Sequence, residues 1–262
     1  MNYTYLSEAV KVKKVSEDEY KGVFEIEGLF RGYGLTVGNA LRRVLLSSLP
    51  GAAITRFTVK GAGHEFTTVP GVVEDVVELG LNLKQVKFAF HAEGPQELTL
   101  RSKGEGEIKA KDISDNPQVR VMNPDLHIAT LSTKGAELDI VLTVEKGLGY
   151  VPVEAQKTER LPVGTIALDA IFSPVVNVNY TVENMRVGDR TDYNRVRVEI
   201  ETDGTISPSS ALHKAANVLT DHLNKVADIE VIQAKEEKAN KEEKVAKKEK
   251  KTEKVEEATK EE

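Results

Sequence analysis

The sequence predicts an α+β fold, and three observations carry that prediction. Short segments in which apolar and polar residues alternate occur before residue 35, from about 52 to 165 and again at 195–201, as in half-buried strands. Two other segments, 36–49 and 208–227, place apolar residues three and four positions apart, as in amphipathic helices. Glycine and proline turns interrupt the central strands at short intervals, which predicts a unit made mostly of sheet.

The first strands are expected at Val10–Val15 and Val23–Ile26. Both are short apolar or alternating stretches, and the polar run Glu17-Asp18-Glu19 between them is typical of a turn. In the central region one segment departs from the strand pattern. After Pro70-Gly71, residues 72–86 follow a helical spacing. The residues on that spacing are Val73, Val76, Val77, Gly80, Leu81 and Lys84.

The first helix carries an unusual leucine. On a helical wheel Leu46 falls roughly 160° from the apolar stripe, on the side of Arg42 and Arg43. An exposed leucine between guanidinium groups has the composition of a protein contact patch. The alternative is an ordinary surface leucine, or one covered by another part of the chain. The apolar stripe consists of Val37, Ala40, Leu41, Val44, Leu45, Ser48 and Leu49.

The second helix has a wide apolar arc. Ser207 is expected as its N-cap and Pro208 at its first position. Ala215 and Ala216 would allow another helix to approach closely. The helix is either buried on two sides within one chain or forms a helix–helix dimer interface, and periodicity does not separate the two. Its stripe consists of Leu212, Ala215, Ala216, Leu219, Leu223 and Val226.

Composition excludes several classes of protein. The 262 residues include no cysteine, which excludes disulfide scaffolds, thiolate zinc sites and cysteine nucleophiles. No apolar run approaches the ~18 residues of a membrane helix, and no secretory signal is visible, so we expect a cytoplasmic protein with no membrane partner. The net charge of −6 argues against a general nucleic-acid binder.

The segment 234–262 is a charged tail. It holds ten lysines and ten glutamates among 29 residues, so the −6 belongs to the rest of the chain. Its few apolar residues form no stripe. This composition favours disorder or a fraying helix over a partner-binding role.

One continuous run and six shorter blocks carry a family resemblance. The run reads Phe30-Arg31-Gly32-Tyr33-Gly34-Leu35-Thr36-Val37-Gly38-Asn39-Ala40-Leu41-Arg42-Arg43-Val44-Leu45-Leu46-Ser47-Ser48-Leu49-Pro50-Gly51. It closely resembles the signature of the alpha subunit of bacterial DNA-directed RNA polymerase. The blocks follow in the family's order, so that the resemblance covers roughly residues 5–230. They are His64-Glu65-Phe66, Val72-Val73-Glu74-Asp75 with Leu81-Asn82-Leu83-Lys84, Gly147-Leu148-Gly149-Tyr150-Val151-Pro152, Asp169-Ala170-Ile171-Phe172-Ser173-Pro174-Val175, Arg190-Thr191-Asp192 and Glu201-Thr202-Asp203-Gly204-Thr205-Ile206-Ser207-Pro208.

The resemblance implies a discontinuous dimerisation subdomain, built from strands and the two main helices, with an inserted, mostly β subdomain. The dimerisation subdomain would comprise residues 1–51 and 167–233, and the insert residues 52–166. The resemblance also implies a homodimer that serves as the assembly platform of the polymerase. One copy would meet the beta subunit and the other beta-prime.

The resemblance also implies the contact residues. Arg43 and Leu46 match positions on the surface that meets the large subunits, and so do Glu78 and Lys84. We place Arg42 with them because it lies on the same helix face. The dimer and core stripe would consist of Val37, Leu41, Val44, Leu45, Leu212, Ala215, Leu219 and Leu223. Gly32, Gly34 and Gly38 are expected to allow a tight entry of the chain into the helix, the alternative being an ordinary loop.

The carboxyl-terminal part departs from the family pattern. Typical alpha subunits continue into a small helix-hairpin-helix domain that binds promoter DNA, and here only the charged tail follows Ile232. We therefore expect no such domain, and contact with DNA only indirectly through the polymerase.

No active site is visible in the sequence. The five histidines are scattered, and there is no phosphate-loop motif or nucleophile elbow. We expect no catalytic residue, cofactor, metal or small-molecule ligand in this chain, which would be a non-catalytic subunit of a nucleotidyltransferase. The alternatives are a dimeric transcription regulator or scaffold not bound to polymerase, a DNA-binding regulator and an independent hydrolase or transferase.

Overall fold

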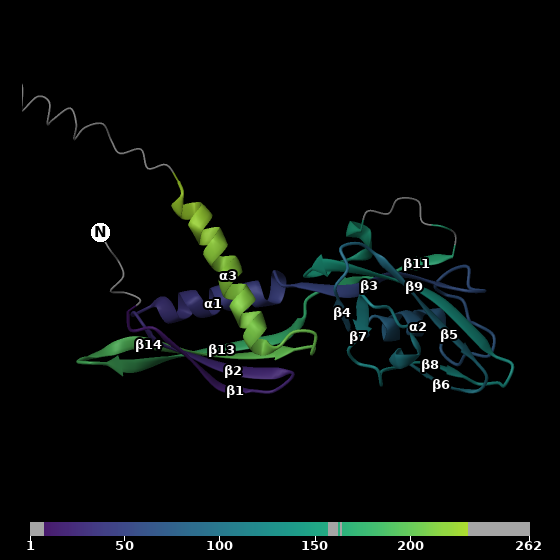
Figure 1. Cartoon of the computed structure of the whole chain (residues 1–262), viewed down its shortest axis with the longest axis horizontal. Coiled ribbons are helices and arrows are strands. Elements are labelled where there is room, and N and C mark those ends of the chain that lie inside the picture. The colour runs from purple at the N-terminus through teal and green to yellow at the C-terminus, as the bar shows by residue number, and fades with distance from the viewer. Residues whose placement is uncertain (1–7, 157–161, 163, 230–262) are drawn as a thin grey trace, which may run out of the picture. The chain divides into compact units, whose positions relative to one another are not determined.

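The computed structural model describes residues 8–156, 162 and 164–229, and the charged tail lies outside them. The predicted α+β fold is confirmed (Figure 1). Its helices are α1 (Tyr33–Ser47), α2 (Val76–Leu83) and α3 (Pro208–Ala227), with short 3-10 turns at Ala110–Asp112 and Val153–Ala155. The strands are β1 (Lys11–Glu17), β2 (Lys21–Leu29), β3 (Pro50–Val59), β4 (Phe88–Phe90), β5 (Gln96–Lys103), β6 (Gly106–Lys109), β7 (Val119–Val121), β8 (His127–Leu131), β9 (Glu137–Leu148), β10 (Tyr150–Val151), β11 (Thr165–Ala167), β12 (Ala170–Ile171), β13 (Val175–Val187) and β14 (Arg190–Thr202).

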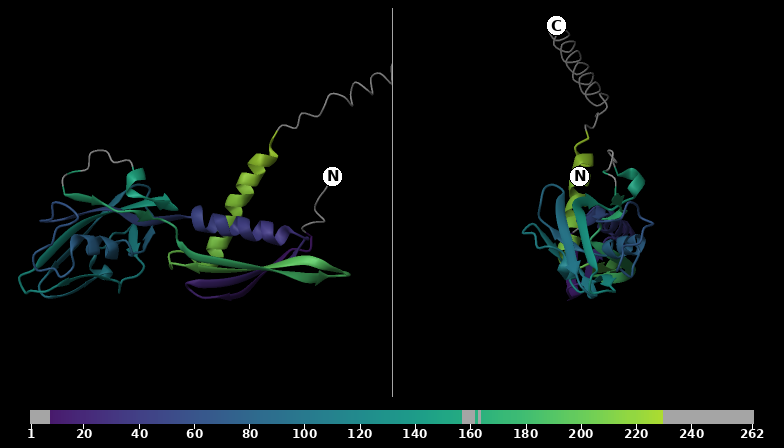
Figure 2. Two further views of the ribbon diagram at one scale, coloured as in Figure 1. Left: turned by 180° about the vertical axis from the view of Figure 1, so that it is seen from behind. Right: turned by 90° about the vertical axis from the view of Figure 1, so that its right-hand side faces the viewer.

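One antiparallel sheet joins the two ends of the folded chain. Its strand order is β1-β2-β14-β13, so β2 of the amino-terminal hairpin pairs with β14, which begins only at Arg190. Alternation along these strands turns their apolar residues to one face of the sheet. Helix α1 lies on that face, as the views from the front (Figure 1) and from behind (Figure 2) show. The core between them also includes the first turns of α3. Its fully buried side chains include Leu45, Val178, Val196, Ala211 and Ala215.

A second hydrophobic core belongs to the central part of the chain. The sheet β11-β3-β9-β5 contributes to it, and the two-stranded pairs β4-β7 and β6-β8 also contribute buried residues. Helix α2 contributes Val76, Leu79 and Leu83, all fully buried. This core contains no residue of α1 or α3.

Helix α3 matches its predicted segment, whereas α1 and α2 differ from theirs. Helix α3 has the predicted bounds, and the Ser207 hydroxyl accepts a hydrogen bond from the Ser210 N–H at 3.4 Å. Helix α2 is shorter than the predicted 72–86, because the Asp75 side chain caps it by accepting from the Glu78 N–H at 2.7 Å. Helix α1 begins at Tyr33, three residues earlier than expected.

The glycines at the start of α1 act differently from what the sequence predicts. Gly32, at φ 85°, does turn the chain at the helix start. Gly34 and Gly38 instead lie inside the helix, one turn apart, facing the sheet. A Cβ on Gly34 would lie 2.7 Å from Val182 Cγ1, and one on Gly38 would lie 2.6 Å from Tyr180 Cδ2. These two glycines therefore permit α1 to approach β13 more closely than any larger residue would.

Substitution of Gly38 tests this close approach. The Cβ of Gly38→Ala would overlap the Tyr180 ring, and the overpacking exceeds the gain in helix propensity, so the free energy of unfolding should fall by about 1–2 kcal/mol. Chemical denaturation measures the change. Gly63→Ala is the matched control, because a Cβ there meets nothing within 4 Å. Equal stability of the two variants would contradict the account.

Candidate interaction surfaces

The outer side of α1 carries three residues of the expected contact patch. Arg43 is exposed, and its guanidinium forms no hydrogen bond or ion pair with the residues that the structure describes. Arg42 is also exposed, but its Nε donates a hydrogen bond to the Val178 carbonyl at 3.0 Å. Arg42 therefore attaches α1 to β13, and Arg43 is the group that remains directed to solvent.

The position of Leu46 differs from the one that the helical wheel predicts. It is half-buried and packs against the same core as Leu41 and Leu45, not exposed as the wheel predicts. That core includes residues of α3 as well as the sheet, so the covered arc of α1 is wider than one stripe. The alternative of partial cover within the chain describes Leu46 better, and only part of its surface is available to a partner.

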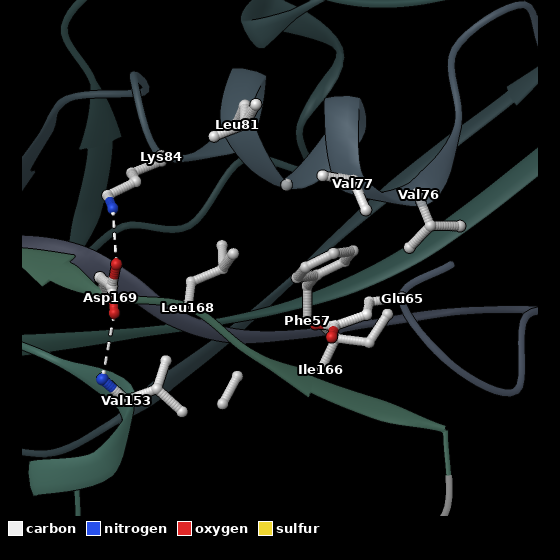
Figure 3. Close-up of a pocket in the computed structure, with 12 residues that line it drawn as sticks. Phe57, Glu65, Val76, Val77, Leu81, Lys84, Val153, Ile166, Leu168 and Asp169 are labelled. Carbon is white, nitrogen blue, oxygen red and sulfur yellow. Dashed lines mark hydrogen bonds and ion pairs between the residues drawn. The ribbon is translucent and has the colours of Figure 1, made fainter. Parts of the chain in front are cut away.

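The residues of α2 form a separate surface. The Glu78 carboxylate is exposed and has no partner among the described side chains. Lys84 is instead paired, with its Nζ 3.1 Å from Asp169 Oδ2. Figure 3 shows Lys84 and the Val153 N–H converging on the Asp169 carboxylate from opposite sides, and the N–H donates to Oδ1 at 3.1 Å. Lys84 thus ties α2 to the segment that precedes β12.

The Asp169 carboxylate interacts electrostatically with Lys84, Val153 and Tyr150. The Lys84 ammonium, followed by the Val153 N–H, lowers the pKa of the Asp169 carboxyl below its ordinary value. Tyr150 lies beside it, and burial together with the Asp169 charge raises the pKa of the Tyr150 hydroxyl. Because the Lys84 ammonium and the Val153 N–H both stabilise the ionised form of Asp169, its carboxylate holds the end of α2 and the segment around Val153 together at neutral pH.

A shallow apolar groove lies next to this ion pair. It has a volume of about 170 Å³ and runs between α2 and β11 (Figure 3). Leu81, 57% exposed, and Val77 line the groove from α2 and are both exposed. Val73, Val77 and Leu81 share the predicted helical spacing with Val76 and Gly80. The structure separates them, because the buried face of α2 consists of Val76, Leu79, Gly80 and Leu83. The main lining residues are Phe57, Val76, Val77, Leu81, Ile166 and Leu168.

The expected dimer and core stripe is divided between core and surface. Leu41, Leu45 and Ala215 are buried, and Val37, Val44, Leu212 and Leu219 are half-buried against the same core. Leu223 and Val226, two further turns along α3, are 66% and 69% exposed. The apolar row of α3 therefore continues beyond the residues that the core covers.

The α1 patch and the α2 surface are not joined into one cluster. They belong to different hydrophobic cores, and no described hydrogen bond or ion pair links them. Sequence reasoning missed Asp169, whose partners are distant along the chain, and Asn194. The signal for Asn194 was readable, because a polar residue stands where the alternation of Val196, Val198 and Ile200 requires an apolar one.

Two kinds of feature are absent from the described residues. Residues 8–156, 162 and 164–229 contain no cluster of three or more histidine, aspartate or glutamate side chains arranged to hold a metal ion. In the same part of the chain no helix has the length and apolar character to cross a membrane.

Comparison with known proteins gives a consistent result. Residues 55–173 match the family model described as the RNA polymerase Rpb3/RpoA insert domain. The chain is 49% identical over 230 residues to the DNA-directed RNA polymerase subunit alpha of Symbiobacterium thermophilum, covering 85% of this chain and 73% of that protein. It is 46% identical to the subunit alpha of Alkaliphilus oremlandii and 45% to that of Carboxydothermus hydrogenoformans, covering 74% and 76% of those proteins.

The ion pair at Asp169 predicts a pH-dependent signal. The carboxyl of Asp169 should titrate below the ordinary value of about 3.9, and Lys84→Met should raise its midpoint. Because the folded-state pKa is lowered, the pair stabilises the fold at neutral pH and loses this effect as the pH falls through that pKa. Carboxyl carbon NMR measures both midpoints, with Lys60→Met as the exposed control. An unchanged Asp169 midpoint in Lys84→Met would show that the pair does not form in solution.

Proposed function

The chain belongs to the alpha-subunit family of bacterial DNA-directed RNA polymerase, and we propose that it forms a homodimer on which the beta and beta-prime subunits assemble. The family is the assembly subunit of the polymerase, a nucleotidyltransferase complex. On this proposal the partners are a second copy of the chain and the two large subunits. DNA is reached only through the complete complex.

The observation that carries the dimer proposal is the exposed apolar end of α3. Leu223 and Val226 continue the row of Leu212 and Leu219, yet they lie in solvent in the single chain. An apolar helix face of this kind needs cover from a second surface. A second copy supplies the same face in a two-fold arrangement, which is the commonest symmetry of soluble oligomers.

The proposed contact with the large subunits uses the α1 patch and the α2 surface. Arg43 supports this assignment because it is an exposed guanidinium beside the partly accessible Leu46, and arginine with an apolar anchor is typical of interface hot spots. On α2, Glu78 supplies an exposed carboxylate and Leu81 an exposed apolar side chain. Arg42 and Lys84 contribute by holding these two helices in place through their contacts within the chain.

We assign no catalytic residue to this chain. The proposed surfaces present single charges and apolar side chains, a combination that suits binding. The chemistry of RNA synthesis would then belong to the other subunits. We keep the predicted division into 1–51 with 167–233 and 52–166 as part of the proposal. The two large hydrophobic cores support it, and a small third cluster of Ala53, Ala170 and Phe172 contains residues of both parts.

Substitution of Arg43 tests the contact with the large subunits. Arg43→Ala should leave a folded dimer but weaken capture of beta and beta-prime by about 2 kcal/mol, roughly 30-fold, as truncation of an interface hot spot does. Pull-down of the large subunits by the purified chain measures capture. Arg120→Ala is the matched control, because Arg120 is an exposed arginine of β7 with no described partner. Equal capture by both variants would refute the assignment of Arg43.

Substitution of Leu223 tests the dimer. Leu223→Asp places a carboxylate on the exposed apolar row, so it should yield folded monomers by burying a charge in the dimer interface. Sedimentation velocity measures the mass, and circular dichroism checks the fold. Asn224→Asp adds the same charge one residue further, about 100° round the helix, and should remain dimeric. A dimeric Leu223→Asp variant would place the interface elsewhere.

A further inference from the structure

We propose that Asn194 is a positioning residue that fixes α1 on the sheet and thereby sets the place of Arg43 and Leu46. Its side chain, from β14, performs the capping that the residues at the start of α1 do not provide. The effect on capture of the large subunits rests on the proposed function, whereas the effect on α1 does not.

Helix α1 begins without a side-chain cap of its own. Its N-cap residue is Gly32, which has no side chain, and the first turn contains no acidic residue. The first N–H groups of a helix need acceptors from outside the helix. The Phe30 carbonyl accepts from the Tyr33 N–H at 3.0 Å. Asn194 Oδ1 accepts from the two N–H groups on either side, Gly32 at 2.9 Å and Gly34 at 3.3 Å.

The Asn194 amide is itself held in one orientation. Asn194 is only 8% exposed, and its Nδ2 donates to Asn184 Oδ1 at 3.1 Å. Asn184 is its direct partner across the β13–β14 pair. With the nitrogen engaged on β13, the oxygen is directed to the helix. This makes Asn194 a fixed acceptor, since a buried amide with both ends paired has little freedom to rotate.

The backbone around the contact is shaped to permit it. A Cβ on Gly34 would lie 2.8 Å from the Asn194 Cβ, so only glycine allows the N–H to come within reach. The pairing of β14 with β2 is irregular between Asn194 and Val196, and Gly28 at that point has φ 74°. Irregularities of this kind redirect a side chain out of the regular ladder.

The consequence for the proposed contact surface is geometric. Asn194 attaches the first turn of α1, and the hydrogen bond from Arg42 to Val178 attaches its third turn. Two attachments on neighbouring strands fix the helix along its axis, and Arg43 follows Arg42 directly. Loss of the first attachment should therefore shift or loosen the contact residues without altering any of them.

The test compares loss and restoration of the acceptor. Asn194→Leu keeps the size and removes the acceptor, and it should speed amide exchange at Gly32 and Gly34 at least tenfold and weaken capture of beta and beta-prime. Asn194→Asp keeps an acceptor, now charged and favoured by the helix dipole, and should restore both. It also leaves the Asn184 amide free to rotate and donate. Amide exchange at Ile140, in the other core, is the internal control and should not change.

A milder variant covers the case in which Asn194→Leu does not fold. Asn184→Ala removes only the support of Asn194, at an exposed position, and should also speed exchange at Gly34. Unchanged exchange in Asn184→Ala and Asn194→Leu, or failure of Asn194→Asp to restore it, overturns the positioning role. Faster exchange with undiminished capture upholds the attachment of α1 but removes this helix from the proposed large-subunit surface.

Discussion

The close approach of α1 to β13 and β14 is the constraint on which the core between α1, α3 and the sheet β1-β2-β14-β13 depends. Gly34 and Gly38 allow the backbone of the helix to reach the sheet, and the Tyr180 ring lies against the second of them. At this distance Leu45 is fully buried, whereas Arg43, on the opposite side of the helix, stays in solvent. The same geometry that builds the core therefore decides which residues remain available to a partner.

Local signals in the sequence predicted local features well. Helix α3 has its predicted bounds because a serine N-cap and a following proline act within one turn. The start of α1 was missed because its glycines lower helix propensity and its acceptor comes from Asn194, 160 residues away. A wheel for one helix could not decide whether Leu46 is exposed or covered within the chain, because it contains no information on the rest of the core.

For the candidate surfaces too, the sequence predicted the residues but not their distant partners in the fold. The sequence marked Arg42, Arg43, Glu78 and Lys84, but it could not indicate which charges are already paired within the chain. Arg42 is bound to the Val178 carbonyl and Lys84 to Asp169, so both serve the fold directly. Periodicity left open whether α3 is buried on two sides within one chain or meets a second copy. The family resemblance favours the second copy.

On the proposed function, two copies of this chain carry the two large subunits. Native mass spectrometry of the purified chain mixed with beta and beta-prime tests it most directly. The expected result is one complex that contains two copies of the 28.8 kDa chain and one of each large subunit. A complex with a single copy, or large subunits that remain unbound while the chain stays alone, would contradict it.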